Sequence, residues 1–217
     1  MPNLILVIGN KAYSSWSLRP WLLMKQAGIG FGEIRLSLYE DGAKQKILHY
    51  SATGKVPVLK DGDLTIWDSL AICEYLAEKY PEKRLWPSET AARAHARSIS
   101  AEMHSGFTNL RTQMPMNVRR EITGRARTAD VLAEISRIEA IWNDCRSRFG
   151  ARGSFLFGAF SIADAMYAPV VSRLRTYGVA LAGAAAQYAG AIHALPAMQE
   201  WIAGAHAETE VNPQYES

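Results

Sequence analysis

The strand-like segments of this 217-residue chain all lie before residue 80, and the residues that follow have helical spacing. Before that point, short apolar or alternating runs are separated by helical segments and by turns rich in Gly and Asp. The order β-α-β-α-β-β-α predicts an open sheet with helices on both faces. The predicted strands are Leu4–Ile8 (buried on both faces), Glu33–Leu38, Val56–Leu59 and Leu64–Trp67, and the predicted helices cover residues 15–27, 41–50 and 70–80.

The second part of the chain has apolar residues every three or four positions, which is typical of helices that bury one face. One such stripe predicts a single long helix, and three further helices are predicted downstream. The Ala- and Gly-rich segment before the last helix is left unassigned. The stripe consists of Ile99, Met103, Phe107, Leu110 and Met114, and the later helices cover Val131–Phe149, Ser161–Tyr177 and Leu195–Ala205.

Two prolines, Pro81 and Pro87, flank a polar linker between these parts. We therefore predict an α/β domain over residues 1–80 and an all-helical domain over residues 88–217. Beyond Val211 the chain is mostly polar, which predicts a loose tail.

Composition excludes several classes of protein. With 48% hydrophobic and 21% charged residues the chain is not disordered, and a net charge of +3 without a dense basic run argues against nucleic acid as a partner. Cys73 and Cys145 cannot form a disulfide framework, and no Cys/His group has metal-ligand spacing, so no metal is expected. The apolar run Leu4–Ile8 is too short to span a membrane. We expect a soluble protein of a reducing, cytoplasmic compartment, with no membrane partner.

Three serines lie in the segment Tyr13–Pro20, between a predicted strand and a helix. Because Pro20 is tolerated only in the first turn, Ser14, Ser15 or Ser17 lies at the helix N-terminus. Unpaired backbone N–H groups there favour an anion, and a hydroxyl could donate a hydrogen bond to a thiolate. The alternative is that one serine only caps the helix.

The dipeptide Val56-Pro57 opens a predicted strand. A trans proline at a strand edge is the common arrangement, since only about 5–6% of such bonds are cis. A cis bond would direct the backbone polar groups of Val56 outward, toward a peptide-like ligand.

The pair Asp68-Ser69 follows a strand and begins a helix. Ser69 could cap the helix or bind a carboxylate, and Asp68 could bind an ammonium group. Together they would suit the head group of an α-amino acid, although such pairs are often only caps.

Ser161 and Asp164 have the spacing of a capping box, with Phe160 placed as a hydrophobic staple. We interpret this segment, which begins at Gly158, as structural.

Taken together, these four segments resemble the cytosolic glutathione S-transferase superfamily over nearly the whole chain. Ser14–Arg19 resembles the serine motif of the zeta class, with Trp16 where that class has Cys, and its register also resembles the beta class. The fold that the resemblance implies is a thioredoxin-like domain followed by an all-α domain. It further implies a homodimer.

The resemblance implies that reduced glutathione binds as co-substrate, with no metal. Counting back from Arg19 places the theta-class serine at Ser15, whereas the zeta motif points to Ser14; we take Ser15 as the thiol contact and keep Ser14 as the alternative. The implied glutathione contacts are Lys55 for the glycyl carboxylate, Val56 and Pro57 for the cysteinyl backbone, and Asp68 and Ser69 for the γ-glutamyl group.

The chemical task of such a site is to ionise a thiol. A free cysteine thiol has a pKa of about 8.5, so roughly 3% is thiolate at pH 7. Lowering that pKa by about two units takes about 2.7 kcal/mol of differential stabilisation. One hydroxyl hydrogen bond and a helix N-terminus can supply it.

The second, electrophilic substrate is expected where the first helix of the all-α domain faces the serine loop. Adaptable Met and Phe side chains suit an apolar substrate, and an arginine suits an acidic group. Glu102 is placed to reach glutathione across the dimer. The candidates for the electrophile site are Trp16, Met103, His104, Phe107 and Arg111.

These features predict a glutathione transferase acting in detoxification. The alternatives are a glutathione-dependent isomerase of the maleylacetoacetate type and a non-catalytic glutathione-binding protein. Three departures from the zeta pattern disfavour the isomerase: Trp16 for Cys, Asp68 for Gln, and Ser51-Ala52 for Asn-Pro. A thioredoxin-like oxidoreductase is disfavoured because the chain has no Cys-x-x-Cys.

Overall fold

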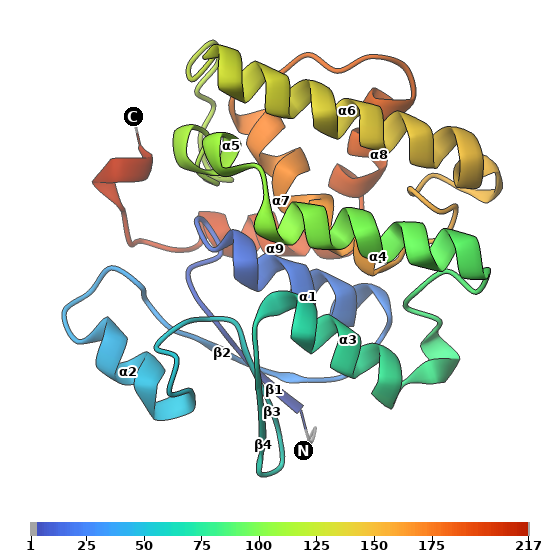
Figure 1. Cartoon of the computed structure of the whole chain (residues 1–217). Coiled ribbons are helices and arrows are strands. Elements are labelled where there is room, and N and C mark those ends of the chain that lie inside the picture. Colours follow the sequence, from blue (N-terminus) through green and yellow to red (C-terminus); the bar gives the residue numbers. More distant parts are fainter. Residues whose placement is uncertain (1–3, 217) are drawn as a thin grey trace.

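The structure, a computed structural model, describes residues 4–216. A four-stranded sheet with three helices forms the first part of the chain, and a layer of helices packs over it as the second part (Figure 1). The predicted class, an α/β domain followed by an all-helical domain, is confirmed. Within the described residues, no helix is both long and apolar enough to cross a lipid bilayer.

The sheet has the strand order β2-β1-β3-β4. β1 runs parallel to β2 and antiparallel to β3, which forms a hairpin with β4. β2 ends three residues earlier than predicted because the chain bends toward the loop after β1, where the N–H of Leu38 donates to the Asn10 side chain at 2.8 Å. The strands are β1 (Leu4–Ile8), β2 (Gly32–Arg35), β3 (Val58–Asp61) and β4 (Leu64–Trp67).

The helices of this part cover the two faces of the sheet unequally. α1 (Ser15–Gln26) and α3 (Ser69–Lys79) lie between the sheet and the second part of the chain, whereas α2 (Ala43–Tyr50) lies to one side (Figure 1). On the face away from α1, Val7 is buried but Ile5 is 37% exposed. The prediction that β1 is buried on both faces is therefore wrong at Ile5, because α2 covers only part of that face.

The second part is organised around α7 (Ile162–Thr176), in which every residue except Arg175 is buried. This helix packs against both α1 and α4, so it joins the two parts of the chain. The unassigned Ala- and Gly-rich segment forms α8. The other helices are α4 (Thr90–Ser105), α5 (Thr108–Gln113), α6 (Ala129–Phe149), α8 (Gly183–His193) and α9 (Pro196–His206), with short 3-10 turns at Pro81–Lys83, Gly150–Arg152 and Pro213–Tyr215.

The predicted long helix through the first apolar stripe is wrong, because the chain breaks between α4 and α5. Phe107 has a φ of 58°, in the left-handed region, and Gly106 ends α4. The Arg111 side chain folds back and donates to the carbonyls of Gly106 at 2.9 Å and His104 at 3.1 Å, and also to that of Met103. These bonds satisfy the free carbonyl groups at the end of α4.

The capping box predicted at the start of α7 is confirmed. Asp164 is fully buried, and its carboxylate accepts from the backbone of Leu156 at 3.0 Å and of Ser161 at 2.8 Å, and from the Ser161 hydroxyl at 2.9 Å. Burial raises the pKa of Asp164 to about 6, although these hydrogen bonds favour the charged form.

The C-terminal residues are not a loose tail. Glu216 accepts a hydrogen bond from the Tyr13 hydroxyl at 2.6 Å, and the backbone oxygen of Tyr215 accepts one from Asn117 at 2.9 Å. The Tyr215 ring packs against Tyr13 and Tyr39, with centroids 5.6 and 6.2 Å apart. The polar composition of the tail concealed these tertiary contacts.

Candidate active site

A cavity of about 820 Å³ lies where the loop before α1 meets the second part of the chain. It brings together nine residues predicted from the sequence: Ser14, Ser15, Trp16, Lys55, Val56, Pro57, Asp68, Ser69 and Arg111. Tyr13, from the same loop as the serines, also lines it. Further walls come from α2 and the loop before it, from the segment after α5, from α7 and from the tail: Leu38, Tyr39, Ile47, Met116, Arg173 and Tyr215.

The two candidate serines differ in their hydrogen bonds. Ser14 precedes α1 and its hydroxyl donates to the oxygen of Ser17 at 2.7 Å, which also accepts from the backbone of Gly9. Ser15 is the first residue of α1, and its hydroxyl oxygen accepts from the guanidinium of Arg173 at 3.0 Å. Because a guanidinium can only donate, this bond leaves the Ser15 proton available to an acceptor in the cavity.

Three arginines surround the start of α1. Arg19 and Arg173 are buried and Arg111 is half-buried, and burial lowers the pKa of all three, to about 9 for Arg19 and about 10 for Arg173. Charge repulsion from Arg111 further lowers the pKa of both Arg19 and Arg173, and repulsion from Arg173 further lowers that of Arg19. This part of the cavity is therefore strongly electropositive, and the N-terminus of α1 adds to the field.

Trp16 lies between two of these guanidinium groups. The Arg19 carbon is 4.2 Å and the Arg111 carbon 4.9 Å from the centre of the indole ring. The edge of the His104 ring approaches the same indole at 5.2 Å. Cation–π contact stabilises such an arrangement and holds both arginines in place.

The peptide bond between Val56 and Pro57 is cis. Strand pairing begins only at Val58, so Val56 lies outside the ladder and borders the cavity. Lys55, which is exposed, lies at the rim.

Asp68 and Ser69 lie on the cavity wall at the start of α3. One oxygen of Asp68 caps the helix, accepting from Leu70 at 2.9 Å and from the next residue, and the other lies 3.1 Å from His104 Nε2. The Ser69 hydroxyl oxygen accepts from Arg19 at 3.1 Å, so its proton is free to donate. Burial lowers the pKa of His104, against the opposing effect of Asp68.

Four predicted residues do not line the cavity. Met103, on the buried face of α4, and Phe107, just after that helix, belong to the hydrophobic core. His104 contacts Trp16 and Asp68 behind the wall of the cavity. Glu102, proposed to reach a partner, forms a paired ion contact with Arg137 of its own chain at 2.8 and 2.9 Å.

Sequence reasoning missed Arg173 and Tyr215. Arg173 lies 158 residues after Ser15, so no local motif joins them. A signal was present, since Arg173 continues the buried face of α7 and a charge on such a face needs a partner. No pattern in the sequence marked Tyr215 as a residue of the cavity.

Tyr13 also borders the cavity, but its hydroxyl is directed to the tail. It donates to Glu216, and it accepts from the backbone of Asn212 at 3.1 Å and from Arg119 at 2.5 Å. Burial and the hydrogen bond to Glu216 raise its pKa. Tyr13 is thus less suited than Ser15 to donate a proton into the cavity.

Comparison with known proteins supports the same interpretation. Residues 13–79 match the model for the glutathione S-transferase N-terminal domain, and residues 124–204 match that for the C-terminal domain. Glutathione S-transferase GstB of Escherichia coli K12 is 30% identical over 141 residues, 61% of this chain and 64% of that protein. A probable maleylacetoacetate isomerase of Caenorhabditis elegans is 35% identical over 96 residues, which is 44% of each chain. The match thus spans less than half the length of this curated relative.

Two solved structures have the same fold. A glutathione transferase homologue from Burkholderia with bound glutathione has a TM-score of 0.72 at 22% identity, covering 94% of this chain and 99% of that one. A bacterial zeta-class maleyl pyruvate isomerase has a TM-score of 0.73 at 20% identity, covering 95% and 100%. Because the two domain models together match more than half of the sequence, this chain belongs to the glutathione S-transferase family.

Proposed function

We propose that this protein is a glutathione transferase, which activates the thiol of reduced glutathione for attack on an electrophilic substrate. The observation that carries the proposal is the Ser15 hydroxyl, whose oxygen accepts from Arg173 at the N-terminus of α1 and whose proton is left free for an acceptor in the cavity. Reactions of this kind remove reactive electrophiles, a detoxification role.

We propose Ser15 rather than Ser14 as the thiol contact. The Ser14 proton is already donated to Ser17. Ser15, by contrast, gains a more acidic hydroxyl from the guanidinium on its oxygen, which strengthens the bond that it can donate to a thiolate. The thiol loses its proton to solvent. The thiolate sulfur then forms a bond to the electrophilic carbon, and the leaving group on that carbon (chloride, for a chlorodinitrobenzene-type substrate) departs with its bonding electron pair, while Ser15 stays neutral.

The remaining contacts support an extended glutathione molecule. The free Ser69 proton suits the γ-glutamyl carboxylate, and the carboxylate of Asp68, which lines the cavity, suits its ammonium group. Val56, outside the strand ladder, has backbone groups for the cysteinyl residue, and Lys55 suits the glycyl carboxylate.

The electrophile would occupy the side of the cavity lined by Tyr39, Met116 and Tyr215. These side chains present an aromatic and apolar wall, while Arg173 and Arg111 offer positive charge. This combination favours a flat electrophile that carries an acidic group.

A glutathione-dependent cis-trans isomerase is the second candidate. Two observations favour it: the arginines beside Ser15, which suit a substrate with carboxylates, and the isomerase names of several relatives. A non-catalytic glutathione-binding protein is the third.

Binding and turnover distinguish these candidates. Calorimetry with glutathione tests the ligand, conjugation of a chlorodinitrobenzene-type electrophile tests transfer, and turnover of maleylacetone tests isomerisation. We expect micromolar-to-millimolar binding and conjugation. Binding without turnover of either substrate would favour the third candidate, and no binding at millimolar glutathione would refute all three.

We propose that the protein works as a homodimer in the cytoplasm. Trp67 is 54% exposed on β4 and lines a surface hollow together with the exposed Leu48, and such an apolar surface suits a subunit contact. Both cysteines are free and buried, as suits a reducing compartment. Sedimentation of the wild type and of Trp67→Glu tests the dimer.

A further inference from the structure

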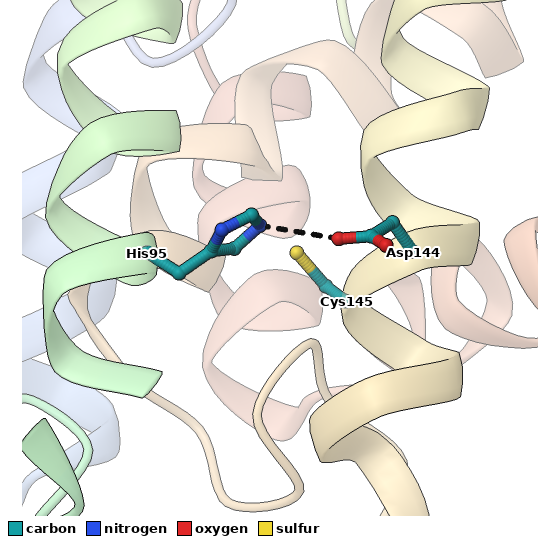
Figure 2. Close-up of side chains that lie close together, drawn as sticks. All are labelled: His95, Asp144 and Cys145. Carbon is teal, nitrogen blue, oxygen red and sulfur yellow. Dashed lines mark ion pairs between the residues drawn. The ribbon is translucent and has the colours of Figure 1, made fainter. Parts of the chain in front are cut away.

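Away from the cavity, three side chains that commonly bind transition metals converge between α4 and α6. His95 lies on α4, and Asp144 and Cys145 are adjacent on α6 (Figure 2). One ligand atom from each lies within 4.8 Å of the other two. Spacing along the sequence could not indicate this group, because its histidine and cysteine lie on different helices.

The distances are close to those of a metal site. His95 Nε2 and Asp144 Oδ2 are 3.4 Å apart. Two ligands about 2.1 Å from a tetrahedral zinc ion are themselves about 3.4 Å apart, and a thiolate at about 2.3 Å lies about 3.6 Å from each. The Cys145 sulfur points into the gap between the imidazole and the carboxylate (Figure 2), so an inward shift of about 1 Å completes the set.

Burial increases from the surface toward the sulfur. The Asp144 and His95 side chains are 46% and 28% exposed, and Cys145 is fully buried. An ion would therefore enter from solvent and keep a position open to water. The His95 ring is held against Phe149 and Phe157, with centroids 5.7 and 6.2 Å apart.

One group competes with an ion at this place. Arg148 donates to Asp144 Oδ2 at 3.0 Å, the oxygen that also faces His95. The second oxygen of Asp144 remains available to the arginine if an ion takes the first.

We propose that His95, Asp144 and Cys145 bind one divalent transition-metal ion of the zinc type, with water as fourth ligand. Imidazole and thiolate ligands favour such an ion over magnesium or calcium, which prefer oxygen. The Cys145 proton leaves to solvent as the sulfur–metal bond forms, without oxidation or reduction. The ion would link α4 to α6 and stabilise the helical domain.

Cobalt(II) is the probe that tests this site, since it reports a sulfur ligand by a near-ultraviolet charge-transfer band. We expect the wild type to bind one equivalent with this band. Cys145→Ser should abolish the band, and His95→Gln should weaken binding at least about tenfold. Cys73→Ser is the matched control, because Cys73 is buried on α3 and should leave the band unchanged.

Replacing Arg148, which competes with an ion for the Asp144 carboxylate, gives an independent test. Arg148→Gln should bind cobalt(II) and zinc more tightly than the wild type, and zinc should raise the Tm of both proteins but not that of His95→Gln. A wild type without the band, a band that survives Cys145→Ser, or a His95→Gln variant that binds cobalt(II) as tightly as the wild type would overturn the proposal. These readouts do not depend on glutathione or on transferase activity.

Discussion

The guanidinium of Arg173, on α7, donates a hydrogen bond of 3.0 Å to the hydroxyl oxygen of Ser15, although the two residues are 158 positions apart in the chain. Its other nitrogen donates to the Arg111 backbone oxygen at 3.3 Å and to that of Met114. The bond to Ser15 joins the helical domain directly to the proposed thiol site, so the position of the serine depends on both domains.

Ser15→Ala should lower turnover at least about tenfold, because the hydrogen bond to the thiolate is lost. It should also raise the pKa of the thiol of bound glutathione. The acidic limb of the profile of kcat/KM against pH then moves to higher pH. Ultraviolet titration of the bound thiol measures this pKa. Ser14→Ala should have the smaller effect, and unchanged profiles in both variants would contradict a serine mechanism.

Arg173→Gln should reduce kcat/KM by about tenfold and move the acidic limb of the pH profile to higher pH. It removes both a positive charge near the thiolate and the hydrogen bond that holds the Ser15 hydroxyl. Arg175→Gln is the matched control: Arg175 lies on the same helix but is exposed. Steady-state kinetics over pH 5–9 compare the two, and equal effects would argue against a specific role of Arg173.

Tyr215→Ala should raise the KM for the electrophile about fivefold, the equivalent of about 1 kcal/mol, and leave the KM for glutathione nearly unchanged. The reason is that Tyr215 forms part of the aromatic wall of the cavity. Tyr215→Phe keeps the ring and should behave like the wild type. An equal rise in both KM values would instead indicate a general loss of structure.

Asp164→Ala should lower the free energy of unfolding by at least about 2 kcal/mol, because it leaves buried donors on Leu156 and Ser161 without an acceptor. Urea unfolding measures the loss. Glu89→Ala removes the cap of α4, where the carboxylate is exposed, and should cost less. A loss no larger than that of Glu89→Ala would show that the capping box contributes little beyond an ordinary cap.

The parts of the site that depend on neighbouring residues could be predicted from the sequence. Ser15, Val56 and Ser69 each lie where a helix or strand of the first domain begins, and local patterns of turns and caps mark such positions. The strands of the sheet were predictable for the same reason, whereas its thioredoxin-like arrangement was predicted from the family resemblance.

The parts of the fold and of the site that depend on tertiary contacts could not be predicted from the sequence. An apolar stripe has the same spacing on one helix as on two, so periodicity could not indicate the left-handed Phe107 or the return of Arg111. Likewise, Glu216 looks like any polar tail residue until Tyr13 is placed opposite it.

The folded tail has a practical consequence for anyone who produces this protein. Tyr215 borders the cavity and Glu216 is bonded to Tyr13, so a bulky label attached at either residue would lie beside the cavity. Placing the label on an exposed residue far from the cavity avoids this interference, and a paired comparison of the two labelled proteins would reveal how far the cavity tolerates crowding.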